Sequence, residues 1–217
     1  MGLARGSRGI AYPNSELVFY DNGVLDRAMA ARIDAFLGHF EASSREPETQ
    51  LPATSPVRSI LFTDIESHTS MMQRLGDAKG REVLREHERL TREALAAHGG
   101  AEVKTMGDGF MASFGSAQRA LECAIALQRA FTSREGEPLR IRVGINAGEP
   151  IAEDDDLFGS SVIIAARTAA QAQGGEVLVT DVVRQLLAGK GFSFSDRGEV
   201  ALRGIEDPVR LFEVGWD

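Results

Sequence analysis

The sequence predicts an α+β fold, in which a mixed β-sheet is covered by helices mainly on one face, and three observations support this. From residue 57 onward, short apolar runs typical of strands alternate with longer amphipathic stretches. An Asp-Gly pair separates two of these short runs, which indicates a β-hairpin because glycine tolerates the positive φ of a tight turn. Other strands are separated by segments of helical length, so hairpins and helical crossovers both connect the sheet.

The order of elements from residue 57 onward follows from these patterns. A strand at Arg58–Thr63 leads into two helical stretches, Ser67–Leu75 and Ala78–His98. The remaining predicted elements are hairpin strands at Glu102–Met106 and Phe110–Phe114, a helix at Ala117–Phe131, a strand at Arg140–Asn146, an acidic loop at Glu153–Asp156, a helix at Ser160–Gln173, a strand at Val177–Thr180, a short helix at Asp181–Ala188, and short strands near Phe192–Phe194, Glu199–Leu202 and Arg210–Val214.

The N-terminal part of the chain is predicted to be separate. A strand at Glu16–Tyr20 and an amphipathic helix at Val24–Phe40 cannot bury a core alone. We therefore expect residues 1–41 to be a strand-helix segment and a candidate remnant of an upstream domain. Residues 42–56 are rich in Ser, Thr, Pro and Glu and are expected to be a linker, which leaves residues 57–217 as the main domain.

Composition narrows the classes of function. The 217 residues are 43% hydrophobic and carry a net charge of −8, without a basic stripe, so a nucleic-acid surface is not expected. No apolar run of about 18 residues is present, so we expect no transmembrane helix. The single cysteine, Cys123, excludes an internal disulfide and fits a reducing compartment, so the predicted location is cytoplasmic.

Two aspartates stand at the edges of predicted strands. Asp64 ends the first strand of the main domain, and Asp108 lies in the Gly-Asp-Gly turn of the hairpin. If the hairpin pairs beside the first strand, the two carboxylates face one point, as a pair of Mg²⁺ ions bound to a nucleoside triphosphate requires. The alternative interpretations are a helix N-cap for Asp64 and an ordinary turn residue for Asp108.

Four segments of the main domain, taken together, resemble a known family. They are Phe62-Thr63-Asp64-Ile65, Lys104-Thr105-Met106-Gly107-Asp108-Gly109, Arg142-Val143-Gly144-Ile145-Asn146-Ala147-Gly148 and Phe158-Gly159-Ser160-Ser161-Val162-Ile163-Ile164-Ala165-Ala166-Arg167. In order and spacing they are similar to the class III nucleotide cyclase catalytic domain, over roughly Val57–Trp216. The resemblance implies a ferredoxin-like βαββαβ core with additions, and a head-to-tail homodimer with active sites at the interface.

The resemblance also implies roles for individual residues. Asp64, Asp108 and the main-chain carbonyl of Ile65 would hold two ions of Mg²⁺ or Mn²⁺ per site. Arg167 would stabilise charge that develops on the α-phosphate, and Arg203 would contact the triphosphate. The alternatives are a surface salt bridge for Arg167 and a plain surface cation for Arg203.

Lys104 and Asp156 match the positions that read the base in this family. Adenine presents an amino donor and a ring-nitrogen acceptor, whereas guanine presents the reverse pattern. Lysine only donates and aspartate only accepts, so this pair fits ATP and mismatches GTP. Guanylyl cyclases that resemble this family usually carry Glu and a small residue such as Cys there. The alternative is a solvated lysine beside an ordinary acidic run, Glu153–Asp156.

One position departs from the family pattern. The family commonly has Asn four residues before the arginine of this helix, where it positions the ribose, and this chain has Ile163. Isoleucine neither donates nor accepts a hydrogen bond, so water or Ser160 and Ser161 would have to supply the contact. Loss of one oriented polar group costs on the order of 10²–10³ in rate. An adenylate cyclase is therefore the first expectation; the alternatives are a weak or silent nucleotide-binding regulatory domain and a guanylate or dual-specificity cyclase.

The spacing of the histidines argues against a zinc site, and the glycine patterns argue against two common nucleotide-binding motifs. His39, His68, His87 and His98 are not spaced as a zinc set, and surface or capping roles are expected for them. Neither the phosphate-binding pattern G-x-x-x-x-G-K-[ST] nor a G-x-G-x-x-G after a strand is present, so a P-loop and a Rossmann site are unsupported.

Overall fold

The computed structural model describes residues 17–20, 23–26 and 56–216 of the chain, and for the first two segments it describes the backbone alone. The chain divides into two compact units, Met1–Leu51 and Pro52–Asp217. The finer division into an N-terminal segment, a linker and a main domain stays a prediction.

In the first unit, β1 (Leu17–Tyr20) and β2 (Gly23–Asp26) form an antiparallel pair. The strand predicted here is confirmed over Leu17–Tyr20. The helix predicted at Val24–Phe40 is wrong where β2 stands, and the rest of that prediction lies outside the described residues. Val24 and Leu25 pair with Phe19 and Val18, so this part of the predicted helix is an extended strand instead.

The second unit is built on a seven-stranded mixed sheet. Its strands are β3 (Arg58–Ile65), β4 (Ala101–Met106), β5 (Gly109–Phe114), β6 (Ile141–Gly148), β9 (Val177–Thr180), β10 (Ser193–Val200) and β11 (Val209–Gly215). Their order across the sheet is β10-β11-β9-β6-β3-β5-β4, and neighbours are antiparallel except for β6 with β9. Two further strands, β7 (Ile151–Glu153) and β8 (Asp156–Phe158), form a separate hairpin.

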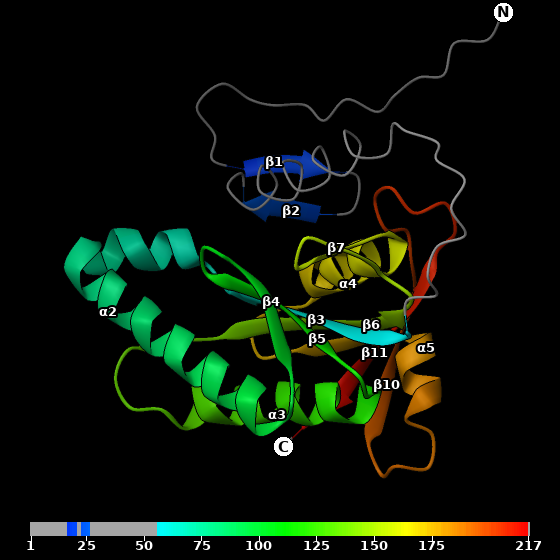
Figure 1. Cartoon of the computed structure of the whole chain (residues 1–217). Coiled ribbons are helices and arrows are strands. Elements are labelled where there is room, and N and C mark those ends of the chain that lie inside the picture. The colour runs from blue at the N-terminus through cyan, green and yellow to red at the C-terminus, as the bar shows by residue number, and fades with distance from the viewer. Residues whose placement is uncertain (1–16, 21–22, 27–55, 217) are drawn as a thin grey trace, which may run out of the picture. The chain divides into compact units, whose positions relative to one another are not determined.

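The described helices cover both faces of this sheet unequally. They are α2 (His68–Ala97), α3 (Ala117–Ser133), α4 (Ser160–Gln171) and α5 (Asp181–Leu186). Figure 1 shows α2, α3 and α5 on one face and α4 on the other, which confirms the predicted layout. The two helical stretches predicted after the first strand are confirmed, because α2 consists of two helical segments that meet at a kink, where Gly76 has a non-helical backbone with φ 73° and ψ 168°.

Two predicted elements differ in detail. The acidic loop is the tight turn of the β7–β8 hairpin, in which Asp154 and Asp155 both have positive φ. The short strands predicted near Phe192–Phe194 and Glu199–Leu202 are parts of one strand, β10, which contains a register shift between Asp196 and Gly198. The bulge hides the continuity of the strand, because it breaks the alternation that sequence patterns rely on.

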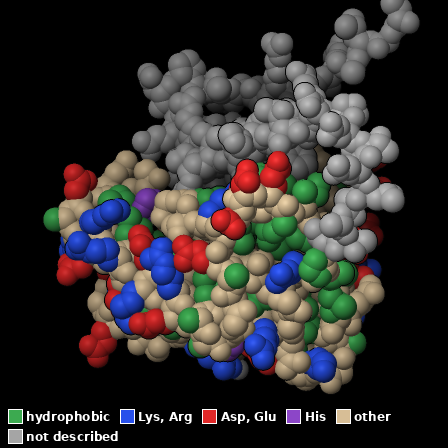
Figure 2. All heavy atoms as spheres, in the orientation of Figure 1, with side chains coloured by type: hydrophobic (Ala, Val, Ile, Leu, Met, Phe, Trp, Pro, Cys, Tyr) green, Lys and Arg blue, Asp and Glu red, His purple; other side chains and the backbone are tan. Residues whose placement is uncertain are grey.

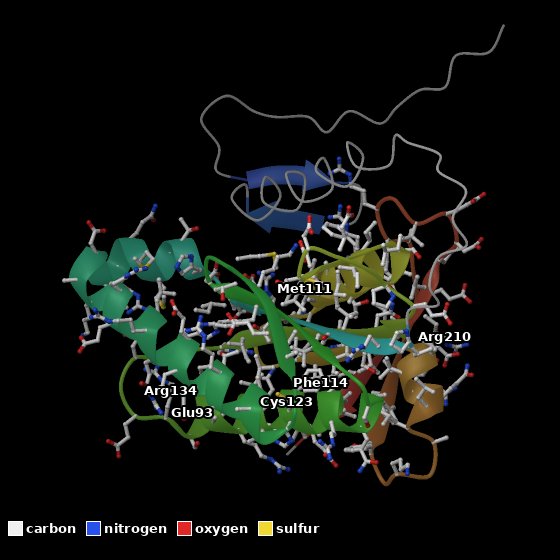
Figure 3. The ribbon with its side chains drawn as sticks, viewed as in Figure 1. Glu93, Met111, Phe114, Cys123, Arg134 and Arg210 are labelled. Atoms are coloured by element: carbon white, nitrogen blue, oxygen red, sulfur yellow. The ribbon has the colours of Figure 1, made fainter. Side chains whose placement is uncertain are left out.

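The main core lies between the sheet and the helices α2, α3 and α5. Alternate residues of β3 and β6 face it, among them Leu61 and Ile145, which lie opposite each other and are fully buried. Figure 3 shows Phe114 and Cys123 on this side of the sheet, and Met111 on the side toward α4. Burial raises the pKa of the Cys123 thiol to about 12, so this residue packs as a small apolar side chain and is not a reactive thiol.

His87 also belongs to this core, so the surface role expected for it is wrong. Its ring lies between Phe110 and Phe131, with ring centroids 5.6 and 5.3 Å away. The residue is 0% exposed, and burial lowers the pKa of the imidazole to about 4. His87 is therefore neutral at pH 7 and acts as an aromatic packing residue of α2.

Charged side chains on the outer face of α2 pair with one another. Arg89 contacts Glu86 and Glu93 at 2.9 and 2.7 Å, at spacings of three and four residues. Figure 2 shows basic and acidic side chains interspersed over the part of the surface formed by α2. Exposed pairs of this kind are screened by water and salt and contribute little, so they support the helix without determining the fold.

On the opposite face, two glycines of β6 allow α4 to approach the sheet closely. A methyl group on Gly144 would lie 2.1 Å from the backbone nitrogen of Ala169, and one on Gly148 would lie 2.8 Å from Cβ of Ser161. Both distances are shorter than any normal carbon contact. Any larger residue at these two positions would push the helix away from the strand.

Asn146 lies between these glycines on β6 and ties α4 to the sheet. Its side-chain amide donates to the carbonyl of Ser161 at 2.9 Å, and its Oδ1 accepts from the hydroxyl of Thr180 at 2.8 Å. The buried amide is thus bonded to α4 on one side and to β9 on the other. The segment from Gly144 to Gly148 therefore determines where α4 sits.

We expect Gly144→Ala to lower the free energy of unfolding by at least about 2 kcal/mol, because the added methyl group overlaps the α4 backbone. Gly115→Ala is the matched control, since a methyl group there meets no atom within 4 Å. Its effect should stay under about 1 kcal/mol. Urea unfolding followed by circular dichroism measures both, and equal stabilities for the two variants would contradict this account of α4 packing.

Candidate active site

The two aspartates predicted to converge are brought together at one edge of the sheet. Thr63 of β3 lies opposite Phe110 of β5, so the next residue, Asp64, faces the turn that joins β4 to β5. A methyl group on Gly109 would lie 2.6 Å from the Thr63 carbonyl oxygen and 3.5 Å from Oδ1 of Asp64. Only glycine fits at this approach, and it places Asp108 beside Asp64.

This pair of carboxylates is buried and electrostatically unfavourable. Asp64 is 8% exposed and Asp108 is 2% exposed. The pKa of Asp64 is raised to about 7, first because burial disfavours the charged carboxylate and second because Asp108 lies nearby; Arg142 acts in the opposite direction. A site with two such carboxylates favours a bound cation, since positive charge relieves both causes of the shift.

Two side chains that contact these aspartates were not among the predicted site residues, and His68 was expected to have a surface or capping role. Arg142 of β6 lies directly opposite Asp64 in the sheet register and makes an ion pair with its Oδ2. His68, in the first turn of α2, places Nδ1 3.7 Å from Oδ2 of Asp108. The sequence does show that Arg142 is unusual, because it is a charged residue in a strand that is otherwise uncharged. Its position opposite Asp64 is known only from the sheet register.

A β-bulge decides which way Lys104 points. Glu102 pairs with Ala112 and Lys104 pairs with Met111, so the residue between them, Val103, is extra in β4. In a regular ladder Lys104 would lie opposite Phe110, on the face that packs against α3. The bulge turns Lys104 to the opposite face, which also carries Asp64 and α4.

Lys104 and Asp156 form an ion pair across 52 residues of sequence. The lysine Nζ lies 2.5 Å from Oδ2 of Asp156, which begins β8. Phe158, two residues further along β8, places its ring centroid 5.7 Å from the same ammonium group. Each partner of the pair is about one quarter exposed, so both polar groups remain within reach of a ligand. The predicted base-reading residues thus lie at one place in the folded chain.

Arg167 and Ile163 stand one turn apart on α4. Arg167 is 6% exposed, so it is not the surface residue of the alternative interpretation. Ile163 is partly exposed, at the position where the family commonly has Asn. Because α4 is anchored on β6, the placement of both residues depends on the helix packing described above.

Arg203 lies away from the paired aspartates within one chain. It is exposed in the loop between β10 and β11, at the edge of the sheet opposite β4. This loop also stands at the end of the sheet where β6 finishes, whereas Asp64 lies beside the start of β6. A single copy of the chain therefore does not bring Arg203 to these carboxylates.

The donor set suits a hard divalent cation held jointly with a substrate. Within the described residues there is no group of three or more His, Cys, Asp or Glu side chains that could hold a metal. Two carboxylates and the carbonyl of Ile65 remain, which are too few for a zinc or calcium cage. Mg²⁺ commonly takes one or two carboxylates and completes its shell with water and substrate phosphates, so the residues fit this ion or Mn²⁺.

The fold and this site define a nucleotide cyclase catalytic domain, and comparison with known proteins agrees. The chain belongs to the adenylate and guanylate cyclase catalytic domain family, whose model matches residues 52–214. A putative adenylate cyclase 3 from Rhizobium meliloti is 32% identical over 160 residues, which are 71% of this chain and 27% of that protein. An adenylate cyclase from Podospora anserina is 29% identical and covers 87% of this chain and 11% of its own length.

Solved structures show the same fold. Adenylate cyclase from Trypanosoma brucei, in its monomeric state, has a TM-score of 0.69 and 27% identity over 73% of this chain and 87% of that one. An adenylate/guanylate cyclase/hydrolase from Silicibacter pomeroyi has a TM-score of 0.65 and 33% identity over 74% of this chain and 97% of that one. These neighbours confirm the predicted class III cyclase architecture.

The chain spans about a quarter or less of the two curated relatives described above. Among the helices of the described segments, none is long and apolar enough to cross a membrane.

We expect Asp64→Asn to stabilise the cation-free protein at pH 8 by on the order of 2 kcal/mol, because the amide cannot carry the buried charge. A carboxyl whose pKa is raised on folding contributes stability at low pH, and this contribution is lost as the pH rises from about 4 to about 7. The advantage of the variant should therefore shrink as the pH falls toward 4. Urea unfolding in EDTA measures it, and parallel pH profiles for wild type and variant would refute the assignment.

Proposed function

We propose that this chain is an adenylate cyclase catalytic domain, which converts ATP to 3′,5′-cyclic AMP and pyrophosphate. The observation that carries the choice of ATP is the Lys104–Asp156 pair. One member only donates and the other only accepts, which matches the amino group and ring nitrogen of adenine and opposes the edge of guanine. The names of several relatives, adenylate cyclases from different organisms, support the same choice.

The reaction needs charge stabilisation more than covalent chemistry. The ribose 3′-oxygen attacks the α-phosphorus in line, its proton is lost, and pyrophosphate leaves from the opposite side. Asp64, Asp108 and the Ile65 carbonyl would hold two ions of Mg²⁺ or Mn²⁺, which when bound lower the pKa of the 3′-hydroxyl and neutralise the triphosphate. Arg167 would donate to the α-phosphate oxygens, where negative charge develops, and Arg203 would bind the triphosphate.

The proposed site is shared between two copies of the chain. Asp64 and Asp108 come from one protomer, and Lys104, Asp156 and Arg167 come from the other. The position of Arg203, at the far edge and far end of the sheet from Asp64, supports an arrangement in which a second copy is required. Two-fold symmetry then creates two identical composite sites. We further propose that the domain acts in the cytoplasm.

Product formation by the purified chain tests this function. With ATP and Mn²⁺ or Mg²⁺, we expect cyclic AMP to form at a rate that rises faster than linearly with protein concentration at dilution, because active sites need two protomers. Asp64→Ala should lose activity by at least on the order of 10²-fold, since a buried ligand of the cations is removed. Chromatographic separation of the products measures both.

The same assay with GTP separates the alternatives. Cyclic GMP formed at comparable rates would overturn the assignment of Lys104 and Asp156 as an adenine-reading pair. A rate strictly linear in protein concentration over the dilution range would overturn the shared site. Absence of any cyclic product, with ATP still bound and the fold intact, would favour the second candidate below.

The second candidate is a weak or silent cyclase domain that binds nucleotide and regulates a partner. Ile163 is the observation that favours it, because its side chain cannot orient a ribose hydroxyl. The paired aspartates, the Lys104–Asp156 pair and the buried Arg167 favour a working enzyme instead.

We expect Ile163→Asn to raise kcat by on the order of 10–100-fold with little change in KM, because an oriented amide would act mainly in the transition state. Ile164→Asn is the matched control, since it makes the same chemical change one residue further along α4, at a similarly part-buried position. If both variants leave kcat unchanged, the ribose is positioned by other groups and Ile163 does not limit the rate.

A further inference from the structure

We infer that Arg142 is a counter-ion of the proposed metal site, which pairs with Asp64 when no divalent cation is bound and lowers the affinity of that site for free cations. The inference rests on the proposed cation site of Asp64 and Asp108. It goes beyond that site because Arg142 is not one of the proposed cation ligands, yet it would control how tightly the nucleotide-free protein binds a cation.

The sheet register places the guanidinium at Asp64. Arg142 begins β6 opposite Asp64 at the end of β3, and the two side chains point to the same face of the sheet. The guanidinium Nη2 makes an ion pair with Oδ2 of Asp64. The side chains are 17% and 12% exposed, so water and salt screen this pair far less than the surface pairs of α2.

A divalent cation and the guanidinium compete for the same carboxylate. Oδ2 of Asp64 is taken by Arg142, while Oδ1 faces the Gly109 turn at the side of Asp108. A cation that bridges the two aspartates would bring two positive groups to one buried carboxylate. Their repulsion is strong where the local dielectric is low, so Arg142 opposes cation binding whether its side chain stays in place or moves away.

The ion pair between Arg142 and Asp64 also affects the protein when no substrate is bound. Asp64 and Asp108 repel each other at a place where both are almost fully buried, and Arg142 offsets this repulsion without a metal. The same contact lowers the affinity for free cations. Cations would then bind mainly when other groups, such as the phosphates of a nucleotide, add to their coordination.

The test is a titration of the nucleotide-free protein with Mn²⁺, in which electron paramagnetic resonance measures the free ion. Arg142→Gln removes the positive charge, and Arg142→Lys keeps a positive charge without the guanidinium. Arg140→Gln is the matched control. Arg140 carries the same charge two residues earlier, but it is 66% exposed, lies 3.7 Å from Glu66 and donates to the carbonyl of Gly174.

We expect Arg142→Gln to bind Mn²⁺ at least about tenfold more tightly than wild type, since a like charge is removed next to the cation. Arg140→Gln should differ from wild type by less than about twofold, because exposed charges are well screened. Arg142→Lys should lie between wild type and Arg142→Gln, and it keeps the test decisive if the glutamine variant does not fold. In EDTA the melting temperature of Arg142→Gln should fall below that of Arg140→Gln, and saturating Mn²⁺ should reverse the difference.

An affinity of Arg142→Gln within twofold of wild type would overturn the inference, as would the absence of detectable Mn²⁺ binding in both. Asp108→Asn in the Arg142→Gln background separates this failure from that of the proposed site. If Mn²⁺ binds that double variant as tightly as Arg142→Gln, the aspartates are not the ligands. If it binds more weakly and Arg142 has no effect, the ligands are correct and the counter-ion role is wrong.

Discussion

Two buried carboxylates of like charge, Asp64 and Asp108, are held side by side, and this unfavourable contact shapes the rest of the site. It exists because Gly109 lets the β4–β5 turn approach the end of β3 more closely than any other residue would. Burial and mutual repulsion raise the pKa of Asp64 to about 7, which a neighbouring arginine only partly offsets. The protein keeps this contact against its own stability, as expected where a cation must be bound.

The sheet face that carries these aspartates also carries α4. The glycines and the asparagine of β6 seat this helix against the sheet, so packing and active-site geometry depend on the same residues. The opposite face has a conventional core with α3, which contains the neutral His87. The face toward α3 therefore contains the main apolar core, and the face toward α4 carries the polar side chains of the candidate site.

Some helices and strands could be predicted from the sequence, and others could not. Helical apolar periodicity predicted α2 and α3 well, and short apolar runs predicted β3, β5 and β6, which are almost entirely buried. Apolar patterning failed at Val24–Asp26, where the residues pair with β1 in a hairpin, and in β10, where a register shift breaks the alternation. The histidine of α2 was misjudged because the sequence does not show which face of a long helix lies against aromatic neighbours.

The sequence alone determined the identity of the chemical groups: two strand-edge aspartates, a lysine and an aspartate suited to adenine, and an arginine on α4. The two aspartates could be recognised from their positions at strand edges, and the other three residues from the resemblance to class III cyclases. Only the tertiary structure decided how they meet. The bulge at Val103 turns Lys104 toward Asp156, and the register of β3 with β6 places Arg142 on Asp64. Both outcomes depend on hydrogen bonding between strands distant in sequence, which local residue patterns do not specify.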